Sequence, residues 1–263
     1  MKAFHRVFAC GVGLLVCLPA GLVSAEGPAP IQDFVQGNRA LLSGAEPRLK
    51  PGDWVTYLFR TNTPTMAGLA RIESLVKISC PLHVGDQPLA AGQFWMEFEM
   101  ADPAGVSGNV MVLKMLVEGD PRQAGAVKRM FIKAGERTPL EIPEERLKKS
   151  ADPGTPCDRG DAEGCRAKGG DHQTRQTKRI YTKVGWLEAQ SVVIRLPGQK
   201  GTREFWVSRK VPVLGFVRAT MENGVSLELE GFGDGALSRI DETQAVPLPD
   251  TKVLERQLQG AAQ

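Results

Sequence analysis

Alternation of apolar and polar side chains is the clearest pattern along this chain. Phe94, Met96, Phe98 and Met100 occupy alternate positions, and successive side chains of a strand point to opposite faces of a sheet. This stretch therefore predicts a strand with one buried face. Other short runs are rich in β-branched and aromatic residues and are separated by Gly, Pro, Asn or Asp, as strands are. The predicted strands cover residues 54–60, 69–79, 93–100, 110–117, 127–133, 179–184, 186–196, 204–208, 215–220 and 226–231.

The spacing of these runs indicates the fold class. Turn signals recur at intervals of about 8–12 residues, which favours an antiparallel meander over βαβ units. Asn223-Gly224 separates the last two runs, and Asn-Gly is a strong hairpin signal. Helical spacing of apolar residues predicts a helix over 31–42, and Pro143 suits the first turn of a short helix within 139–149. We therefore predict a mainly β fold, a curved antiparallel sheet forming an incomplete barrel, with an N-terminal helix and short peripheral helices.

The first 25 residues have the pattern of a secretory signal peptide. Lys2 and Arg6 precede an apolar run over residues 7–23, and Val23-Ser24-Ala25 supplies the small residues at a cleavage site. No later stretch approaches the roughly 20 apolar residues that a membrane helix needs. We expect cleavage after Ala25 and a soluble periplasmic protein without a transmembrane anchor.

The mature chain then divides into three parts. Residues 26–51 form a helical, proline-rich segment, residues 52–246 an antiparallel β domain, and residues 247–263 a polar tail. Within the β domain, residues 150–178 lack nearly all large apolar side chains, which predicts a polar insertion. Because the chain is exported, we expect a local disulfide between Cys157 and Cys165 in this insertion.

Charge and motif content exclude several classes of function. The signal peptide carries two basic residues and no acidic ones, so its removal takes the net charge from +3 to +1, and this near-balance argues against nucleic-acid binding. No glycine-rich strand-to-helix fingerprint occurs, and only His83 and His172 remain as histidines in the mature chain. We expect no cofactor and no enzymatic activity.

Two pairs of carboxylates have the spacing of a shared site. Glu97 and Glu99 lie two residues apart, as do Glu228 and Glu230, so each pair shares one face of its strand. The polar face of an amphipathic strand gives the same pattern, and we assign no catalytic role to either pair.

The Cys80-Pro81-Leu82-His83 stretch is the main candidate for metal chemistry. A thiolate, an imidazole and thioethers all suit copper, and thiolate and imidazole suit zinc. An unpaired cysteine among strands is more often a small buried hydrophobe, and methionines that follow strand alternation fill cores. We assign no metal ligands and keep a Cys/His/Met metal-binding protein as the least favoured alternative. The methionines concerned are Met96, Met100, Met111, Met115 and Met130.

Aromatic residues occupy both faces of several predicted strands, which is more than a sheet with one buried face needs. Either the sheet curves around an apolar groove that holds a ligand, or a second layer packs against it. The candidate groove residues are Trp54, Phe59, Phe94, Met96, Phe98, Met115, Trp186 and Trp206.

Several runs of the sequence resemble a known group of proteins. They cover residues 94–99, 113–119, 128–135, 205–208, 211–217 and 231–238. Together they resemble uncharacterised exported proteins of Gram-negative bacteria, which are similar in pattern to the lipoprotein-carrier (LolA/LolB-like) superfamily. The resemblance implies an incomplete antiparallel barrel that wraps around a helix and holds acyl chains in its cavity.

These observations give two hypotheses of function. The first is a periplasmic carrier or binding protein that holds an acyl chain, a lipid or a lipidated peptide in an apolar groove. The second is a non-enzymatic envelope scaffold that binds a protein partner through a strand edge or through the 150–178 insertion.

Overall fold

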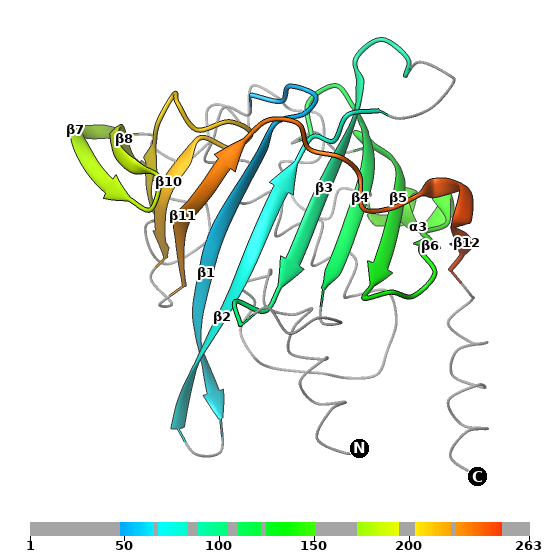
Figure 1. The fold of residues 1–263 in the computed structure, drawn as a ribbon, viewed down its shortest axis with the longest axis horizontal. Helices are drawn as coiled ribbons and strands as arrows, with labels where there is room; N and C mark the ends of the chain where they lie inside the picture. Colours follow the sequence, from blue (N-terminus) through cyan, green and yellow to red (C-terminus); the bar gives the residue numbers. More distant parts are fainter. Residues whose placement is uncertain are drawn as a thin grey trace.

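The computed structural model describes residues 48–65, 68–83, 89–104, 110–121, 125–150, 173–194, 203–221 and 225–248. These residues form one curved sheet of twelve strands in the order β12-β6-β5-β4-β3-β2-β1-β11-β10-β9-β8-β7 (Figure 1). The predicted mainly β fold is confirmed. The predicted signal peptide, the helix over 31–42 and the Cys157–Cys165 disulfide lie outside the described residues.

Every predicted strand is present, and two short ones are added. The first six strands are β1 (Trp54–Thr65), β2 (Gly68–Ser79), β3 (Gln93–Ala101), β4 (Met111–Glu118), β5 (Val127–Ala134) and β6 (Leu140–Glu141). The remaining strands are β7 (Gln173–Thr182), β8 (Gly185–Ile194), β9 (Arg203–Val207), β10 (Phe216–Met221), β11 (Ser226–Gly233) and β12 (Val246–Pro247). Among the described residues, the helices are α3 (Glu144–Ser150), which the prediction over 139–149 placed to within one residue of its end, and the 3-10 turn η2 (Glu242–Gln244). Within the described ranges, no helix is long and apolar enough to cross a membrane.

One edge of the sheet differs from the wholly antiparallel prediction. β12 pairs with β6 in parallel, through Val246 opposite Leu140 and Pro247 opposite Glu141, so the sheet is mixed. A parallel pair needs a crossover connection, and here residues 234–245 run from β11 across the sheet to β12 (Figure 1). We call residues 234–245 the C-terminal strap. A two-residue strand carries no periodicity, and this is why sequence patterning missed it.

The predicted polar insertion is wrong at its C-terminal end. β7 begins at Gln173, so residues 173–178 are strand rather than insertion. β7 lies at the end of the strand order, and Gln176 and Thr177 are exposed. An edge strand of this kind takes its backbone hydrogen bonds from one neighbour, β8, and needs few apolar side chains. Its sequence is therefore as polar as that of a loop.

One face of the sheet carries most of the core, and we call it the methionine face. Met96, Met115 and Met130 lie side by side across β3, β4 and β5. Among described residues, Ile142 and Leu147 join this core beside β5, and Phe216 joins it near β1 and β9. The Phe216 ring lies 5.1 Å from that of Phe205. The buried side chains that define this face are Tyr57, Phe59, Val76, Ile78, Met96, Phe98, Leu113, Met115 and Met130.

The turn between β9 and β10 holds strained backbone against this core. Val213 has φ of 61° and is fully buried, and a positive φ is costly for a β-branched residue. Its backbone N–H and carbonyl both pair with Arg48, at N···O distances of 3.2 and 2.9 Å. Gly215, with φ of 73°, completes the turn. The strained residue follows Pro212 directly and precedes Gly215 by two positions.

The opposite face is covered by the C-terminal strap, and we call it the strap face. Ile240 of the strap is 1% exposed and packs with Trp95, Val112 and Phe131. At the start of the strap, the Ala236 N–H donates to the Gly52 carbonyl at 2.8 Å, and the Ala236 carbonyl accepts from the Leu82 N–H at 2.9 Å. The strap thereby ties β1, β2, β3, β4 and β5 together from one side.

Replacing Ile240 by alanine should lower the free energy of unfolding by about 3 kcal/mol, because it leaves a cavity between the strap and the sheet. Leu237→Ala is the matched control, since Leu237 lies in the same strap but is 63% exposed. The control should change stability by less than about 0.5 kcal/mol. Urea unfolding of both variants measures this, and equal losses would contradict the packing role of Ile240.

Candidate functional site

The structure places five of the eight predicted groove residues on the methionine face. Met96 and Phe98 are buried in β3, Met115 in β4 and Phe59 in β1, and Phe94 is half-buried against the same core. Register explains this grouping. Met96 lies directly opposite Met115, and Phe98 lies opposite Leu113, so alternate residues of adjacent strands share the face.

The three tryptophans of the predicted groove lie elsewhere. Trp54 lies on the strap-face side of β1, where its indole N–H donates to the Asp234 carbonyl at 3.1 Å. Trp206 is buried beneath the ammonium group of Lys178, 3.9 Å from its ring centroid. Trp186 is 58% exposed near the turn between β7 and β8. The sequence already indicated the position of Trp54. Trp54 is an odd number of residues from Phe59 in the same strand, so the two side chains point to opposite faces.

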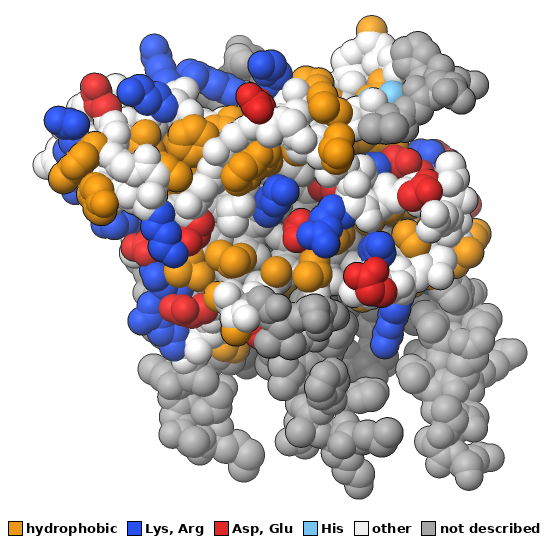
Figure 2. Space-filling model, in the orientation of Figure 1, with side chains coloured by type: hydrophobic (Ala, Val, Ile, Leu, Met, Phe, Trp, Pro, Cys, Tyr) orange, Lys and Arg blue, Asp and Glu red, His pale blue; other side chains and the backbone are white. Residues whose placement is uncertain are grey.

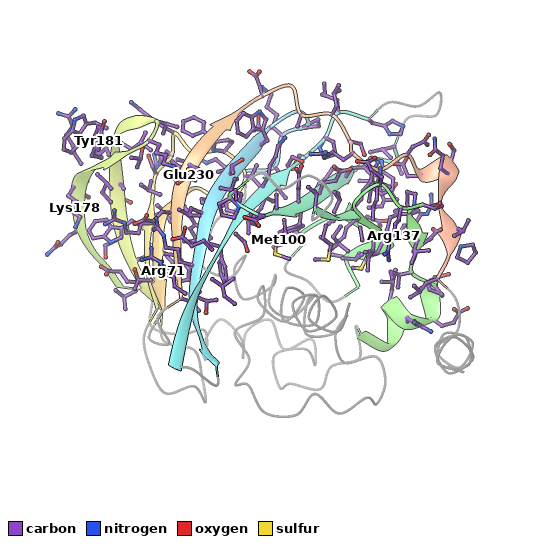
Figure 3. All side chains as sticks on the ribbon, turned by 60° about the horizontal axis from the view of Figure 1, so that its bottom comes forward. Arg71, Met100, Arg137, Lys178, Tyr181 and Glu230 are labelled. Carbon is purple, nitrogen blue, oxygen red and sulfur yellow. The ribbon has the colours of Figure 1, made fainter. Side chains whose placement is uncertain are left out.

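Methionine is the distinctive residue of this face. Met96, Met115 and Met130 form a row across β3, β4 and β5. Met100 lies opposite Met111 on the same face, four residues further along β3. Figure 3 shows sulfur atoms gathered beside the labelled Met100. Thioether side chains are flexible and polarisable, so they adapt to guests of irregular shape. Met96, Met115 and Met130 are at most 5% exposed, so the arrangement provides an adaptable apolar interior.

The Cys80-His83 stretch places its thiol inside the protein. Cys80 is 1% exposed, and its backbone pairs with Asp53 and Gly52. Burial, with a smaller contribution from the Asp53 charge, raises the pKa of the Cys80 thiol to about 12. The thiol is therefore protonated at neutral pH, and the thiolate is the reactive and metal-binding form. In the part of the chain that the structure describes, no three His, Cys, Asp or Glu side chains are grouped to hold a metal ion.

The strap face contains a buried ion network that sequence patterning did not reveal. The side chains of Lys114 in β4 and Glu97 in β3 are each only 3% exposed. The Lys114 ammonium donates to the Ser238 hydroxyl at 2.7 Å and to the Ile240 carbonyl at 3.0 Å, and it also pairs with Glu242. All three of these partners belong to the strap. The ammonium also lies 4.5 Å from the centroid of the Trp95 ring.

Glu97 is fixed by the same segment. Its carboxylate accepts hydrogen bonds from the Ser238 hydroxyl and, at 3.1 Å, from the Arg239 N–H. The ammonium of Lys114 lies 3.9 Å away. Burial raises the pKa of the Glu97 carboxyl above its ordinary value, while the hydrogen bonds from Ser238 and Arg239 and the charge of Lys114 act in the opposite direction. As the alternation of β3 predicts, Glu97 points to the face opposite Met96 and Phe98. That face is buried under the strap.

The other carboxylate pair lines a charged cleft on the far side of β1. Glu228 and Glu230 belong to a cleft of 570 Å³ between β11, β10 and the end of β7. Arg60 pairs with Glu228 and, at 3.0 Å, with Glu73, and Lys183 pairs with Glu230. The charged side chains of the cleft are paired among themselves, and none of the eight predicted groove residues lines it.

Comparison with known proteins gives weak similarities. No protein-family model matches the sequence, and no curated protein matches it. One solved structure is a "putative lipoprotein" from Parabacteroides distasonis, with 14% identity, 72% of this chain and 99% of the other covered, and a TM-score of 0.32. Another is a "putative exported protein with YmcC-like fold" from Bacteroides fragilis, with 14% identity, coverage of 73% and 100%, and a TM-score of 0.32. PNGF-II shares 8% identity over 78% of this chain and 33% of its own, with a TM-score of 0.29. We assign neither family nor function from similarities of this size.

Lys114→Met should destabilise the protein by about 3–5 kcal/mol, because it leaves the Glu97 carboxylate buried without its partner charge. The double variant Lys114→Met/Glu97→Gln should recover about 2 kcal/mol of that loss. Lys128→Met is the control, since Lys128 forms a half-exposed pair with Glu118 at 3.9 Å and should cost less than about 1 kcal/mol. Denaturant unfolding measures all three, and an unrestored double variant would contradict the coupling.

Cys80 should react slowly with iodoacetamide at neutral pH in the native protein and rapidly in urea, because burial keeps the thiol protonated and covered. Peptide mapping by mass spectrometry resolves Cys80 from the other cysteines. Rapid native labelling of the Cys80 peptide would contradict this burial and favour the metal-binding alternative.

Proposed function

We propose that this protein is a non-enzymatic carrier or binding protein of the cell envelope, which holds an acyl chain, a lipid or a lipidated peptide against the methionine face. The observation that carries the proposal is the row formed by Met96, Met115 and Met130, which phenylalanines flank on the same face. The envelope location rests on the predicted signal peptide.

The dimensions of this face suit an extended apolar chain. From Phe94 to Met100, β3 presents apolar side chains at every second position, over a length of about 20 Å. β4 lies alongside with Met111, Leu113, Met115 and Val117 on the same face. An alkyl chain bound here would replace contacts between thioethers and phenyl rings with contacts of the same kind, so its binding needs no polar group to be desolvated.

The strap face is less suited to an acyl chain, because it holds the buried charges of Lys114 and Glu97 as well as apolar side chains. Ile240 and the Lys114 network fill its centre with the protein's own residues. The charged cleft supplies polar groups to a ligand, and these do not suit an alkyl chain. The centre of the methionine face is apolar, and an acyl chain would enter by displacing the packing of its buried side chains.

A protein-binding scaffold is the competing reading, and β7 is the element that would serve it. β7 is the outermost strand and could accept an added strand from a partner. However, Lys178 and Arg179 are exposed in this strand, and charged side chains on an edge strand discourage such pairing. We therefore rank the carrier first.

Organic extraction of protein purified from its native host, followed by mass spectrometry, should recover a fatty acid or phospholipid in stoichiometric amount. The stripped protein should then bind a fluorescent fatty acid saturably. Extracts without lipid, together with no saturable binding by the stripped protein, would overturn the carrier proposal.

Oxidation by hydrogen peroxide should map the bound chain. Met100 and Met111 are half-buried on the methionine face, and an acyl chain lying over them should slow their conversion to sulfoxide. Trp186 is exposed away from this face, so its oxidation rate is the internal control. Peptide mass spectrometry with and without palmitate measures both, and equal rates at Met100 and Met111 in the two samples would contradict binding at this face.

A further inference from the structure

Most of the large apolar side chains that are exposed to solvent lie at one end of the sheet. Five of the six large hydrophobic residues that are exposed among the described ones lie at or just beyond the strand ends on this side of the sheet, where β2 and β7 end and β1 and β8 begin. We call them the apolar rim. Its members are Leu82, Tyr181, Val184, Trp186 and Leu237, with exposures of 41%, 67%, 41%, 58% and 63%.

Strand direction explains why these residues meet at one end. β2 ends opposite the start of β1, so Leu82 follows β2 at this end, and Leu237 bridges to it from the strap. The turn between β7 and β8 reaches the same end, because β8 runs antiparallel to β9, whose last residue leads into the strained turn at Val213. Two apolar clusters therefore lie at the same end of the strands.

The first cluster is aromatic and amphipathic. The rings of Tyr181 and Trp186 lie 5.2 Å apart and tilted by 60°, and the Arg179 guanidinium lies 5.6 Å from the Trp186 ring centroid. Val184 occupies the turn between them. Exposing a tryptophan and a tyrosine together forfeits the burial that such side chains ordinarily gain in folding, so the surface has the character of a binding patch.

The second feature of this end is its positive charge. Arg48, Lys50, Lys183, Arg209 and Lys210 are all exposed here, and the Arg48 guanidinium donates to the Arg209 carbonyl at 2.8 Å. The acidic residues at this end are Asp234 and Glu188, which are exposed, the half-buried Asp53, and Glu230, which pairs with Lys183. The excess positive charge therefore comes from Arg48, Lys50, Arg209 and Lys210. Figure 2 shows the Lys and Arg side chains along the upper edge beside the apolar ones.

We propose that this rim is a docking surface for an anionic phospholipid bilayer. Tryptophan and tyrosine settle at the level of lipid headgroups because they have an apolar body and a polar edge, and lysine and arginine are drawn to the negative potential of anionic lipids. The combination of aromatic, aliphatic and cationic side chains at one end of the sheet matches a flat anionic surface. This proposal does not rest on acyl-chain binding, because the rim and the methionine face share no residue.

The test uses the mature chain and vesicles of phosphatidylcholine with or without phosphatidylglycerol. The protein should float with the anionic vesicles and not with the neutral ones, and added salt should weaken binding because it screens the rim cations. The Trp186 emission should shift to the blue on binding. Trp186→Ser and Leu237→Ser should each weaken the partition by about tenfold, since each removes one buried anchor.

Val246→Ser is the matched control, because Val246 is 46% exposed but lies in β12 at the far edge of the sheet. Its partition should equal that of the wild type. Absence of binding to anionic vesicles, or equal binding by Trp186→Ser, Leu237→Ser and Val246→Ser, overturns the proposal. Fatty-acid titration of the same variants without vesicles should match the wild type, which separates failure of membrane docking from failure of the carrier function.

Discussion

The buried pairing of Lys114 with Glu97 is the constraint on which the rest of this structure depends. Two charged side chains leave water on one face of the sheet, and the cost of doing so is several kcal/mol per ion unless every polar atom is satisfied. The strap satisfies them, through the Ser238 hydroxyl, the Ile240 carbonyl and the Arg239 N–H. The position of the strap across β3 and β4 is therefore fixed by electrostatics, and the packing of Ile240 follows from it.

Because of this constraint, the two faces and one end of the sheet carry different kinds of side chain. The strap covers one face with a buried ion network and Ile240, and the buried methionine and phenylalanine side chains form the core on the other face. The strap also carries Leu237 to the end of the sheet, where it lies near Leu82 and at the same end of the strands as the exposed pair Tyr181 and Trp186. Carrying an acyl chain and meeting a bilayer are compatible roles for a protein arranged in this way.

Alternation placed β3, and runs of β-branched and aromatic residues between turn residues placed the other nine long strands. These patterns could not show that β12 pairs with β6 in parallel, because a strand of two residues has no hydrophobic periodicity. They also could not show that β7 starts at Gln173, because an exposed edge strand needs few apolar side chains. For the candidate site, alternation grouped Phe94, Met96 and Phe98 correctly on one face. Lys114 was missed because a lysine between apolar neighbours reads as the polar side of a strand, and its burial depends on a segment more than 120 residues away.

The most direct test of the account is photochemical cross-linking of a fatty acid that carries a diazirine in its alkyl chain. If the methionine face holds the ligand, the labelled peptides come from β3 and β4, at Gln93–Ala101 and Met111–Glu118, and excess palmitate suppresses them. Labelling confined to the strap or to the turn between β7 and β8, or labelling that palmitate does not compete, would contradict it.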